Sequence, residues 1–172
     1  MKQLIILLFG VFTFISISAQ SLRKYSISGS GCSAYFFCDP GEFKLEKSPD
    51  SSDVYTGECI NDSVTYGAIC VKLSVKLPDL ETSEGTLISY LDYLKSTMKI
   101  KSAAGYGKGH RLKNNEATRG VIDYWRDADG GNWKIKGWTD GKYIVVMYVS
   151  SVKEISESKT NIFLDGLVLP GN

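Results

Sequence analysis

The sequence predicts an α+β domain, in which a mainly antiparallel sheet of about six to seven strands has two principal helices packed on it. Three observations lead to this prediction. Residues 120–149 contain three β-rich runs separated by glycine turns. A stretch beginning near Ser83 has apolar residues at helical spacing. Most joints between the predicted strands are as short as hairpins, which favours antiparallel neighbours.

Residues 1–19 have the three parts of a secretory signal peptide. Lys2 supplies the positive charge, residues 4–15 form an apolar core, and Ala19 precedes the expected cleavage site. The apolar run is short for a membrane span, which needs about 20 residues. The first cysteine, Cys32, does not follow the aliphatic residue that a lipoprotein signal requires. We therefore expect an exported, soluble product, periplasmic or extracellular, that starts at Gln20 and has no stable membrane insertion.

Residues 20–172 are expected to fold as a single domain. Removing 19 of the 172 residues leaves 153, a common size for one domain with its own core. The leader contains Lys2 and no acidic residue, so 19 basic residues balance 19 acidic ones in the remainder. Proteins that bind nucleic acid usually have a basic excess. The balance therefore argues against a nucleic-acid partner.

The first part of this domain reads as strands. Runs at residues 24–28, 34–38, 42–46, 54–60 and 66–77 are rich in β-branched or aromatic residues. Asp39-Pro40-Gly41 forms a turn between the second and third runs. In the fifth run the apolar residues alternate with polar ones from Ile69 to Leu77, which predicts one buried face.

A helix follows this run, then the three-stranded meander, then a second helix. In the first helix, residues 83–101, the positions Leu87, Leu91, Leu94 and Met98 share one face, and Gly105 follows its end. The meander has strands at 121–126, 133–138 and 143–149, joined by turns at Asp129-Gly130-Gly131 and Asp140-Gly141. Its third strand is apolar at every position, as in strands covered on both faces. The second helix spans residues 153–167, and its buried side is marked by Ile155, Ile162, Phe163 and Leu167.

The four cysteines, Cys32, Cys38, Cys59 and Cys70, predict two disulfides in an exported protein, with three possible pairings. The hairpin between Cys59 and Cys70 favours that pair together with Cys32–Cys38, and an interleaved pairing is the alternative. No Cys-x-x-Cys spacing occurs and the one histidine is remote in sequence, so we expect no metal site and no cofactor.

The order of elements resembles the PsbP-like family, an α/β/α sandwich named for an extrinsic subunit of photosystem II and common among small exported bacterial proteins. The resemblance covers most of the chain after the leader. It includes the turn Phe36-Phe37-Cys38-Asp39-Pro40 leading to residues 42–45, the helix 83–101, the meander 120–149 and the closing segment Ile162-Phe163-Leu164-Asp165-Gly166-Leu167. The family shares no catalytic residues, so the resemblance implies a binding or accessory role.

Two groups of residues are candidates for a binding site. In the glycine-rich stretch 105–111, Lys108, His110 and Arg111 could hold an anion with the help of backbone N–H groups. Phosphate loops follow a strand and open a helix, whereas this stretch follows a helix, which favours a flexible connector. In the meander, Trp133 or Trp138 beside Tyr124 could stack a sugar or contact a partner protein, and of the two tryptophans we expect Trp138 to be exposed.

The function that these observations favour is a non-enzymatic binding or accessory protein of the cell envelope or the extracellular space. Its partner would be an envelope or extracellular protein or a small ligand. One alternative is a small hydrolase or transferase that uses His110 with Arg111 and Asp123, because His110 is the only histidine available for acid–base work. A second alternative is an envelope protein that inhibits an enzyme or neutralises a toxin.

Overall fold

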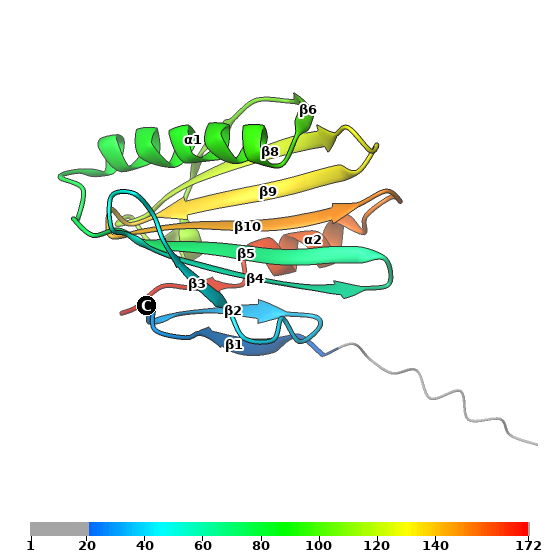
Figure 1. Cartoon of the computed structure of the whole chain (residues 1–172), viewed down its shortest axis with the longest axis horizontal. Helices are drawn as coiled ribbons and strands as arrows, with labels where there is room; N and C mark the ends of the chain where they lie inside the picture. The colour runs from blue at the N-terminus through cyan, green and yellow to red at the C-terminus, as the bar shows by residue number, and fades with distance from the viewer. Residues whose placement is uncertain (1–20, 172) are drawn as a thin grey trace, which may run out of the picture.

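The computed structural model describes residues 21–171, so the expected leader at residues 1–19 lies outside it. Two antiparallel sheets and two α-helices make up this part of the chain (Figure 1). The main sheet has eight strands in the order β3-β4-β5-β10-β9-β8-β6, and β7 also pairs with β8. The smaller sheet has three strands in the order β1-β2-β11.

The elements have the following bounds. The main sheet consists of β3 (Lys44–Lys47), β4 (Asp53–Asn61), β5 (Val64–Lys72), β6 (Ile100–Ala103), β7 (Gly107–His110), β8 (Arg119–Asp127), β9 (Asn132–Thr139) and β10 (Tyr143–Ser151). The small sheet consists of β1 (Arg23–Ile27), β2 (Cys32–Phe36) and β11 (Leu167–Val168). The helices are α1 (Leu80–Thr97) and α2 (Glu157–Leu164), and a short 3-10 turn covers Leu112–Asn114.

The predicted α+β class and antiparallel sheet are confirmed, whereas the predicted number of strands is too low. The sequence favoured one sheet of six to seven strands, and the described residues form eleven strands in two sheets. The missed strands β6, β7 and β11 have four residues or fewer and no apolar alternation. Such short strands exist because a longer neighbour supplies hydrogen bonds, and a local pattern does not show this.

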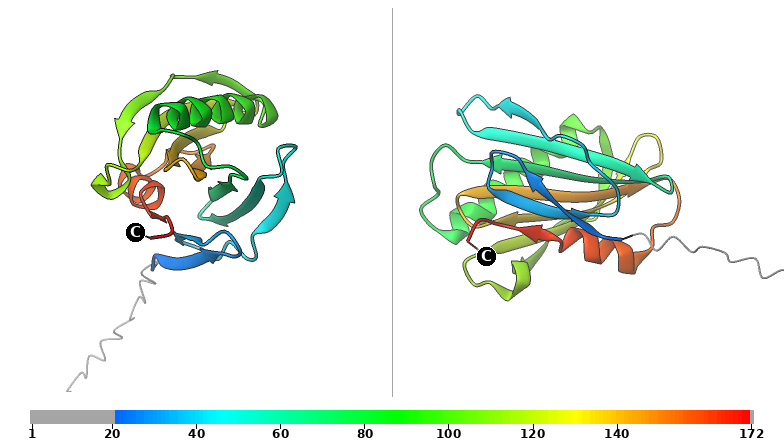
Figure 2. Two further views of the ribbon diagram at one scale, coloured as in Figure 1. Left: turned by 90° about the vertical axis from the view of Figure 1, so that its left-hand side faces the viewer. Right: turned by 90° about the horizontal axis from the view of Figure 1, so that it is seen from below.

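Strand β10 lies between β5 and β9, in the interior of the main sheet, as its apolar run predicts. Its residues alternate between two cores. Ile144 and Val146 pack on the side of α1, and Val145 and Met147 pack on the opposite side. Figure 2 shows α1 over one face of the main sheet, with α2 and the small sheet on the other. The molecule therefore has the layers of a sandwich.

Helix α1 buries the predicted stripe of Leu87, Leu91 and Leu94 against β8 and β9. It begins earlier than predicted because Asp79 caps it, accepting a hydrogen bond from the N–H of Thr82 at 2.7 Å. It also ends earlier, at Thr97, and β6 follows almost at once.

Helix α2 is shorter than the predicted span of residues 153–167. Phe163 is fully buried, but its neighbour Ile162 is exposed, so the prediction that Ile162 faces the core is wrong. Adjacent helical residues point about 100° apart, and only one of the two can face the core here.

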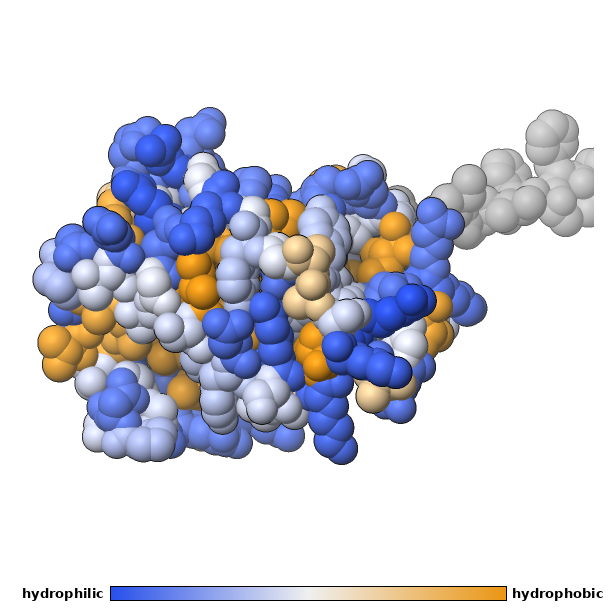
Figure 3. Space-filling view, turned by 90° about the horizontal axis from the view of Figure 1, so that it is seen from above, coloured by the Kyte–Doolittle hydropathy of each residue, from blue (hydrophilic) through white to orange (hydrophobic). Residues whose placement is uncertain are grey.

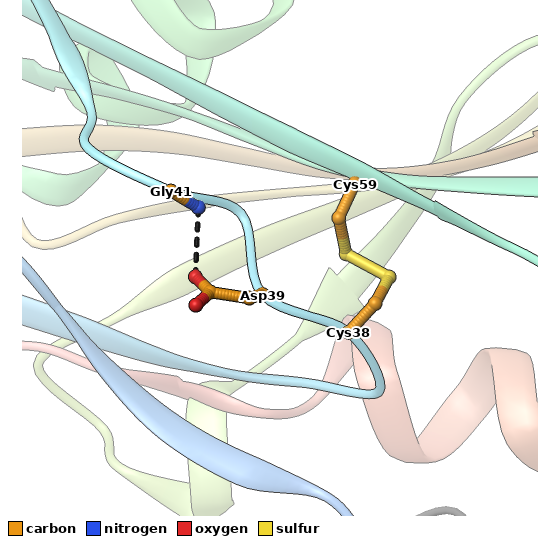
Figure 4. Close-up of a disulfide and its surroundings, with 4 residues drawn as sticks. All are labelled: Cys38, Asp39, Gly41 and Cys59. Carbon is orange, nitrogen blue, oxygen red and sulfur yellow. Dashed lines mark hydrogen bonds between the residues drawn. A yellow bond between two sulfur atoms is a disulfide. The ribbon is translucent and has the colours of Figure 1, made fainter.

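One disulfide joins the segment after β2 to β4, linking Cys38 to Cys59 with Cα atoms 5.9 Å apart (Figure 4). The predicted turn beside it forms, with the N–H of Gly41 donating to Asp39 Oδ1 at 2.8 Å. The favoured pairs Cys59–Cys70 and Cys32–Cys38 are therefore wrong. Cys59 lies opposite Tyr66 in the β4–β5 ladder, four residues before Cys70, too far along the strand for a bond. Cys32 and Cys70 are buried thiols.

Neither helix of the described region is long and apolar enough to cross a membrane. Seen from the side of α1, the surface is mainly hydrophilic and its hydrophobic residues form separate patches (Figure 3). Scattered exposed hydrophobic residues are normal on a protein surface. This face therefore offers no broad apolar area for a partner.

Candidate functional site

A groove of about 330 Å³ lies between the β8–β9 hairpin and the start of α2. Its lining comes from three segments: Tyr124 of β8, residues 132–134 of β9, and Lys153, Glu154, Ile155, Glu157 and Thr160 around the start of α2. The groove thus brings together residues separated by up to 36 positions in the chain. It lies on the face of the main sheet opposite α1.

The turn between β8 and β9 sets the register that places Tyr124 in this groove. Asp127 Oδ1 accepts hydrogen bonds from the N–H groups of Asp129, at 3.0 Å, and Gly131, at 2.7 Å. Its Oδ2 accepts one from the indole of Trp133 at 2.8 Å. The indole bond holds the pKa of Asp127 below its ordinary value, and the backbone bonds add to this effect against the smaller effect of burial. The ionised carboxylate therefore stabilises the turn.

Tyr124 and Lys134 are directly opposite each other in the ladder that this turn sets. Lys134 Nζ lies 5.3 Å from the centroid of the tyrosine ring, within the range of a cation–π contact. The same ammonium donates to Asn161 Oδ1 at 2.9 Å and lies 3.5 Å from Glu157 Oε1. Lys134 is thereby fixed between β9 and α2, and it supports a tyrosine whose surface is still 48% exposed.

The charges around the groove are mixed. Lys134 and Lys153 are basic, and Glu154 and Glu157 are acidic. Neither sign of charge dominates the lining, so the groove does not favour a strongly charged ligand. The arrangement suits a neutral ligand with many hydroxyl groups, which can stack on the tyrosine and exchange hydrogen bonds with both signs of charge.

Trp138 is not part of this surface, so the prediction that it is exposed is wrong. It is only 2% exposed, and its indole donates to the carbonyl oxygen of Leu164 at 3.1 Å. The alternation along β9 does place it on the face opposite Trp133, but α2 covers that face at its position. The alternation of residues therefore predicted correctly which face of the strand Trp138 lies on, but it did not indicate that a helix would cover that face.

Part of the glycine-rich stretch is a strand rather than a loop. Residues 107–110 form β7 along β8, so the predicted flexible connector is a strand over these four positions. Lys108 Nζ lies 3.4 Å from Glu84 of α1, and Arg111 Nε lies 3.1 Å from Glu116. Each cation already faces a carboxylate, which weakens the attraction for an anionic ligand.

The residues considered for acid–base chemistry lie apart. His110 pairs with Gly120 of β8, and its Cβ lies on the same face of that strand as Trp138. Asp123, three residues further on, points to the opposite face and packs beneath α1, as expected from the alternation of a strand. Among the described residues, the hydrogen-bond and ion-pair partners of Asp123 include neither His110 nor Arg111.

Asp123 instead belongs to a buried network that the sequence did not reveal. It is fully buried and accepts hydrogen bonds from the N–H groups of Gly105 and Tyr124 and from the Trp125 indole, at 3.0, 2.8 and 2.6 Å. Lys95 Nζ of α1 lies 3.1 Å from its Oδ2. These four donors satisfy the hydrogen-bonding capacity of the carboxylate. This arrangement fits a structural role for Asp123.

Tyr106 completes this network at the surface. Its oxygen accepts from Lys95 Nζ at 2.7 Å, and its hydroxyl donates to Asp92 Oδ1 at 2.5 Å. Burial lowers the pKa of Lys95, but its bonds to Tyr106 and Asp123 outweigh burial and raise the pKa above its ordinary value. The only local indication was the spacing of Asp92 and Lys95, which is common on exposed helix faces.

A metal site is not apparent in this part of the chain, because residues 21–171 hold no group of three or more His, Cys, Asp or Glu side chains arranged to ligate an ion. No model of a known protein family matches the sequence, and no curated protein matches it either. The geometry of the groove beside Tyr124 makes it the candidate site.

Proposed function

We propose that this chain is an exported, non-enzymatic binding or accessory protein of the cell envelope or the extracellular space, and that the groove beside Tyr124 is its binding site. One observation carries the proposal. Tyr124 is an exposed aromatic side chain held in place by a lysine that is itself fixed by Asn161 and Glu157. An ordered aromatic ring at a polar groove presents a large contact area at a small cost in conformational entropy.

The ligand that suits this groove best is a neutral sugar. A pyranose ring offers apolar C–H groups that stack on an aromatic ring and hydroxyl groups that bond to lysine and glutamate side chains. The resemblance of the order of elements to PsbP-like proteins supports an accessory rather than a catalytic role. The separation of His110 from Asp123 gives no support to the hydrolase or transferase alternative.

Export is supported by the leader-like residues 1–19 and by the Cys38–Cys59 disulfide, since such bonds persist mainly in oxidising compartments. The intact mass of the protein secreted by a bacterial host tests this part. We expect the mass of a chain that begins at or within two residues of Gln20. Recovery of the uncleaved chain in the cytoplasm would contradict export.

A glycan array probed with the full chain, followed by calorimetric titration of any sugar retained, tests the site. The Tyr124→Ala variant should bind about tenfold more weakly, which corresponds to about 1.4 kcal/mol. Tyr93→Ala is the matched control, because Tyr93 is a tyrosine of α1 that is also well exposed but lies outside the groove. It should bind like the wild type, and so should His110→Ala.

Two results would count against the proposal. Equal binding by wild type and Tyr124→Ala would remove the groove as the site. A loss of binding in His110→Ala with retention in Tyr124→Ala would favour the enzyme alternative. The melting temperature of Tyr124→Ala, which we expect to remain close to that of the wild type, distinguishes a binding defect from unfolding.

A further inference from the structure

The buried thiols of Cys32 and Cys70 face each other between the two sheets. Cys32 is the first residue of β2 in the small sheet, and Cys70 lies within β5 of the main sheet. Both belong to the same hydrophobic core, with exposed fractions of 1% and 0%. The turn before Cys32 lies over the part of the main sheet that holds Cys70. Tyr143, opposite Lys72 of β5, donates to the carbonyl oxygen of Ser30 at 2.9 Å, and Gly29 packs on Tyr55, which lies opposite Cys70.

The existing disulfide explains why these two residues meet. It holds the end of the β2 segment at Cys59, which lies opposite Tyr66 of β5. The ring of Phe37 lies 5.4 Å from that of Tyr66 and confirms this alignment. Because Cys38 lies near Tyr66, the residues that precede Cys38 lie near those that follow Tyr66 in β5. Cys32 is therefore brought close to Cys70. The second pair of cysteines meets because β2 runs antiparallel to β5 across the core.

The surroundings of the pair hold Cys32 in place beside Cys70. Ser30 Oγ donates to the carbonyl oxygen of Ile27 at 2.7 Å and accepts from the N–H of Cys32 at 2.9 Å, which fixes the start of β2. The hydrogen bond with Cys70 lowers the pKa of Cys32, against the opposing effect of burial. The same bond, together with burial, raises the pKa of Cys70.

We propose that Cys32 and Cys70 form a second disulfide in the exported protein, so that β2 is bonded to the main sheet at both ends. The oxidant is a small-molecule or protein disulfide, such as glutathione disulfide. The Cys32 thiolate attacks one sulfur of the oxidant, breaks its S–S bond and releases one thiol. Cys70 then loses its proton and attacks Cys32 Sγ in the mixed disulfide, releasing the second thiol. Two electrons and two protons pass in total from the cysteines to the oxidant.

This reaction takes place during folding. In the folded chain both sulfurs lie in the closed core, which excludes an oxidant of the size of glutathione. Before the β1–β2 hairpin packs on β5, the thiols are accessible. The bond is then sealed by the small sheet, and reduction in turn requires unfolding.

The test is the number of free thiols in the full chain exported to an oxidising compartment. The purified protein is unfolded in guanidinium chloride with iodoacetamide and without reductant, and its mass is measured. We expect no alkylated cysteine, and a non-reducing digest should contain a peptide pair joined through Cys32 and Cys70. Alkylation of both residues, or a bond from either to another cysteine, would overturn the proposal.

A variant with Cys38→Ser and Cys59→Ser isolates the proposed bond. After refolding with glutathione disulfide it should again contain no free thiol. Refolding with a reductant should lower its melting temperature by roughly 10 °C, as estimated from the entropy of closing a loop of this length. A melting temperature that is the same with and without reductant would contradict the bond. If the variant does not fold, the peptide map of the wild type still decides.

Discussion

Lys95 of α1 and Asp123 of β8 form an ion pair, 3.1 Å between Nζ and Oδ2, in which the carboxylate is completely buried. The pair joins α1 to the main sheet directly beneath the segment that leads into β7. A buried carboxylate is tolerated because four donors surround it. Removing the one charged donor leaves it uncompensated.

The Lys95→Met variant tests this relationship. Methionine retains most of the aliphatic stem but not the charge, so the loss measures the contacts of the ammonium group with Asp123 and Tyr106. We expect the free energy of unfolding to fall by about 2–3 kcal/mol, at the lower end for buried pairs because the lysine is partly exposed. Urea titration measures the change. Lys101→Met, at an exposed lysine of β6, is the control and should change the value by about 0.5 kcal/mol or less. Equal effects of the two variants would rule out a specific contribution of the pair.

Gly67 of β5 allows the ring of Tyr148 to pack directly against the backbone. A Cβ at this position would lie 2.0 Å from Tyr148 Cζ, and the tyrosine hydroxyl is held by a 2.7 Å bond to Glu58. Gly67→Ala should therefore destabilise the protein by about 2–3 kcal/mol. Gly85→Ala is the matched control, since Gly85 is exposed within α1 with no atom near its added Cβ, and it should stabilise by about 0.5–1 kcal/mol.

Combining Gly67→Ala with Tyr148→Ala checks the cause. If the clash with the ring is responsible, the double variant loses less stability than the sum of the two single variants. Additive losses would point to a different origin.

The disulfide between Cys38 and Cys59 closes a loop with a sequence separation of 21. Replacing both cysteines by serine should lower the free energy of unfolding by about 3 kcal/mol, mainly through the greater entropy of the unfolded chain. Thermal and urea unfolding of the wild type and the variant, both without reductant, give this difference. A loss below about 1 kcal/mol would contradict this entropic contribution of the bond.

The carboxylate of Asp127 should make the protein less stable in acid. Its pKa is lower in the folded state than its ordinary value of 3.8, so the unfolded chain binds the proton more readily. The stability that it contributes is complete above about pH 4 and is lost as the pH falls through the lower, folded value. In Asp127→Asn this loss disappears, so urea titrations from pH 7 to pH 2 should show a smaller decline below pH 4.

Asp129→Asn is the control for this prediction. Asp129 lies in the same turn but accepts none of the three bonds that Asp127 receives. Its pH profile should match that of the wild type. A steep decline in Asp127→Asn would assign the acid sensitivity to other carboxylates.

The sequence predicted the parts of the fold that depend on neighbouring residues. The β9–β10 hairpin forms at Asp140-Gly141, as predicted. Asp140 Oδ1 accepts hydrogen bonds from the N–H groups of Lys142 and Tyr143, and Gly141 adopts the positive φ of 86° that the turn requires. Leu87, Leu91 and Leu94 are buried as their spacing predicted. Of the residues at the groove, Tyr124 and Trp133 were singled out from the sequence as candidate binding residues, whereas Lys134, Asn161 and Glu157 were not.

The missed features depend on contacts between distant segments. Cys38 bonds to Cys59 because the small sheet packs on β4 and β5. Trp138 is buried because α2 packs over β9. Lys95 and Asp123 are 28 positions apart, and nothing in either neighbourhood indicates the other.

The sequence by itself determined the strands of the meander, the apolar face of α1 and the tight turns, because these follow from backbone preferences and side-chain spacing within a few residues. Only the tertiary structure decided the division into two sheets, the pairing of the cysteines and which aromatic residue faces solvent. The physical reason is that several ways of stacking the same elements satisfy the same local patterns. The choice among them is made by the total burial and hydrogen bonding of the assembled layers.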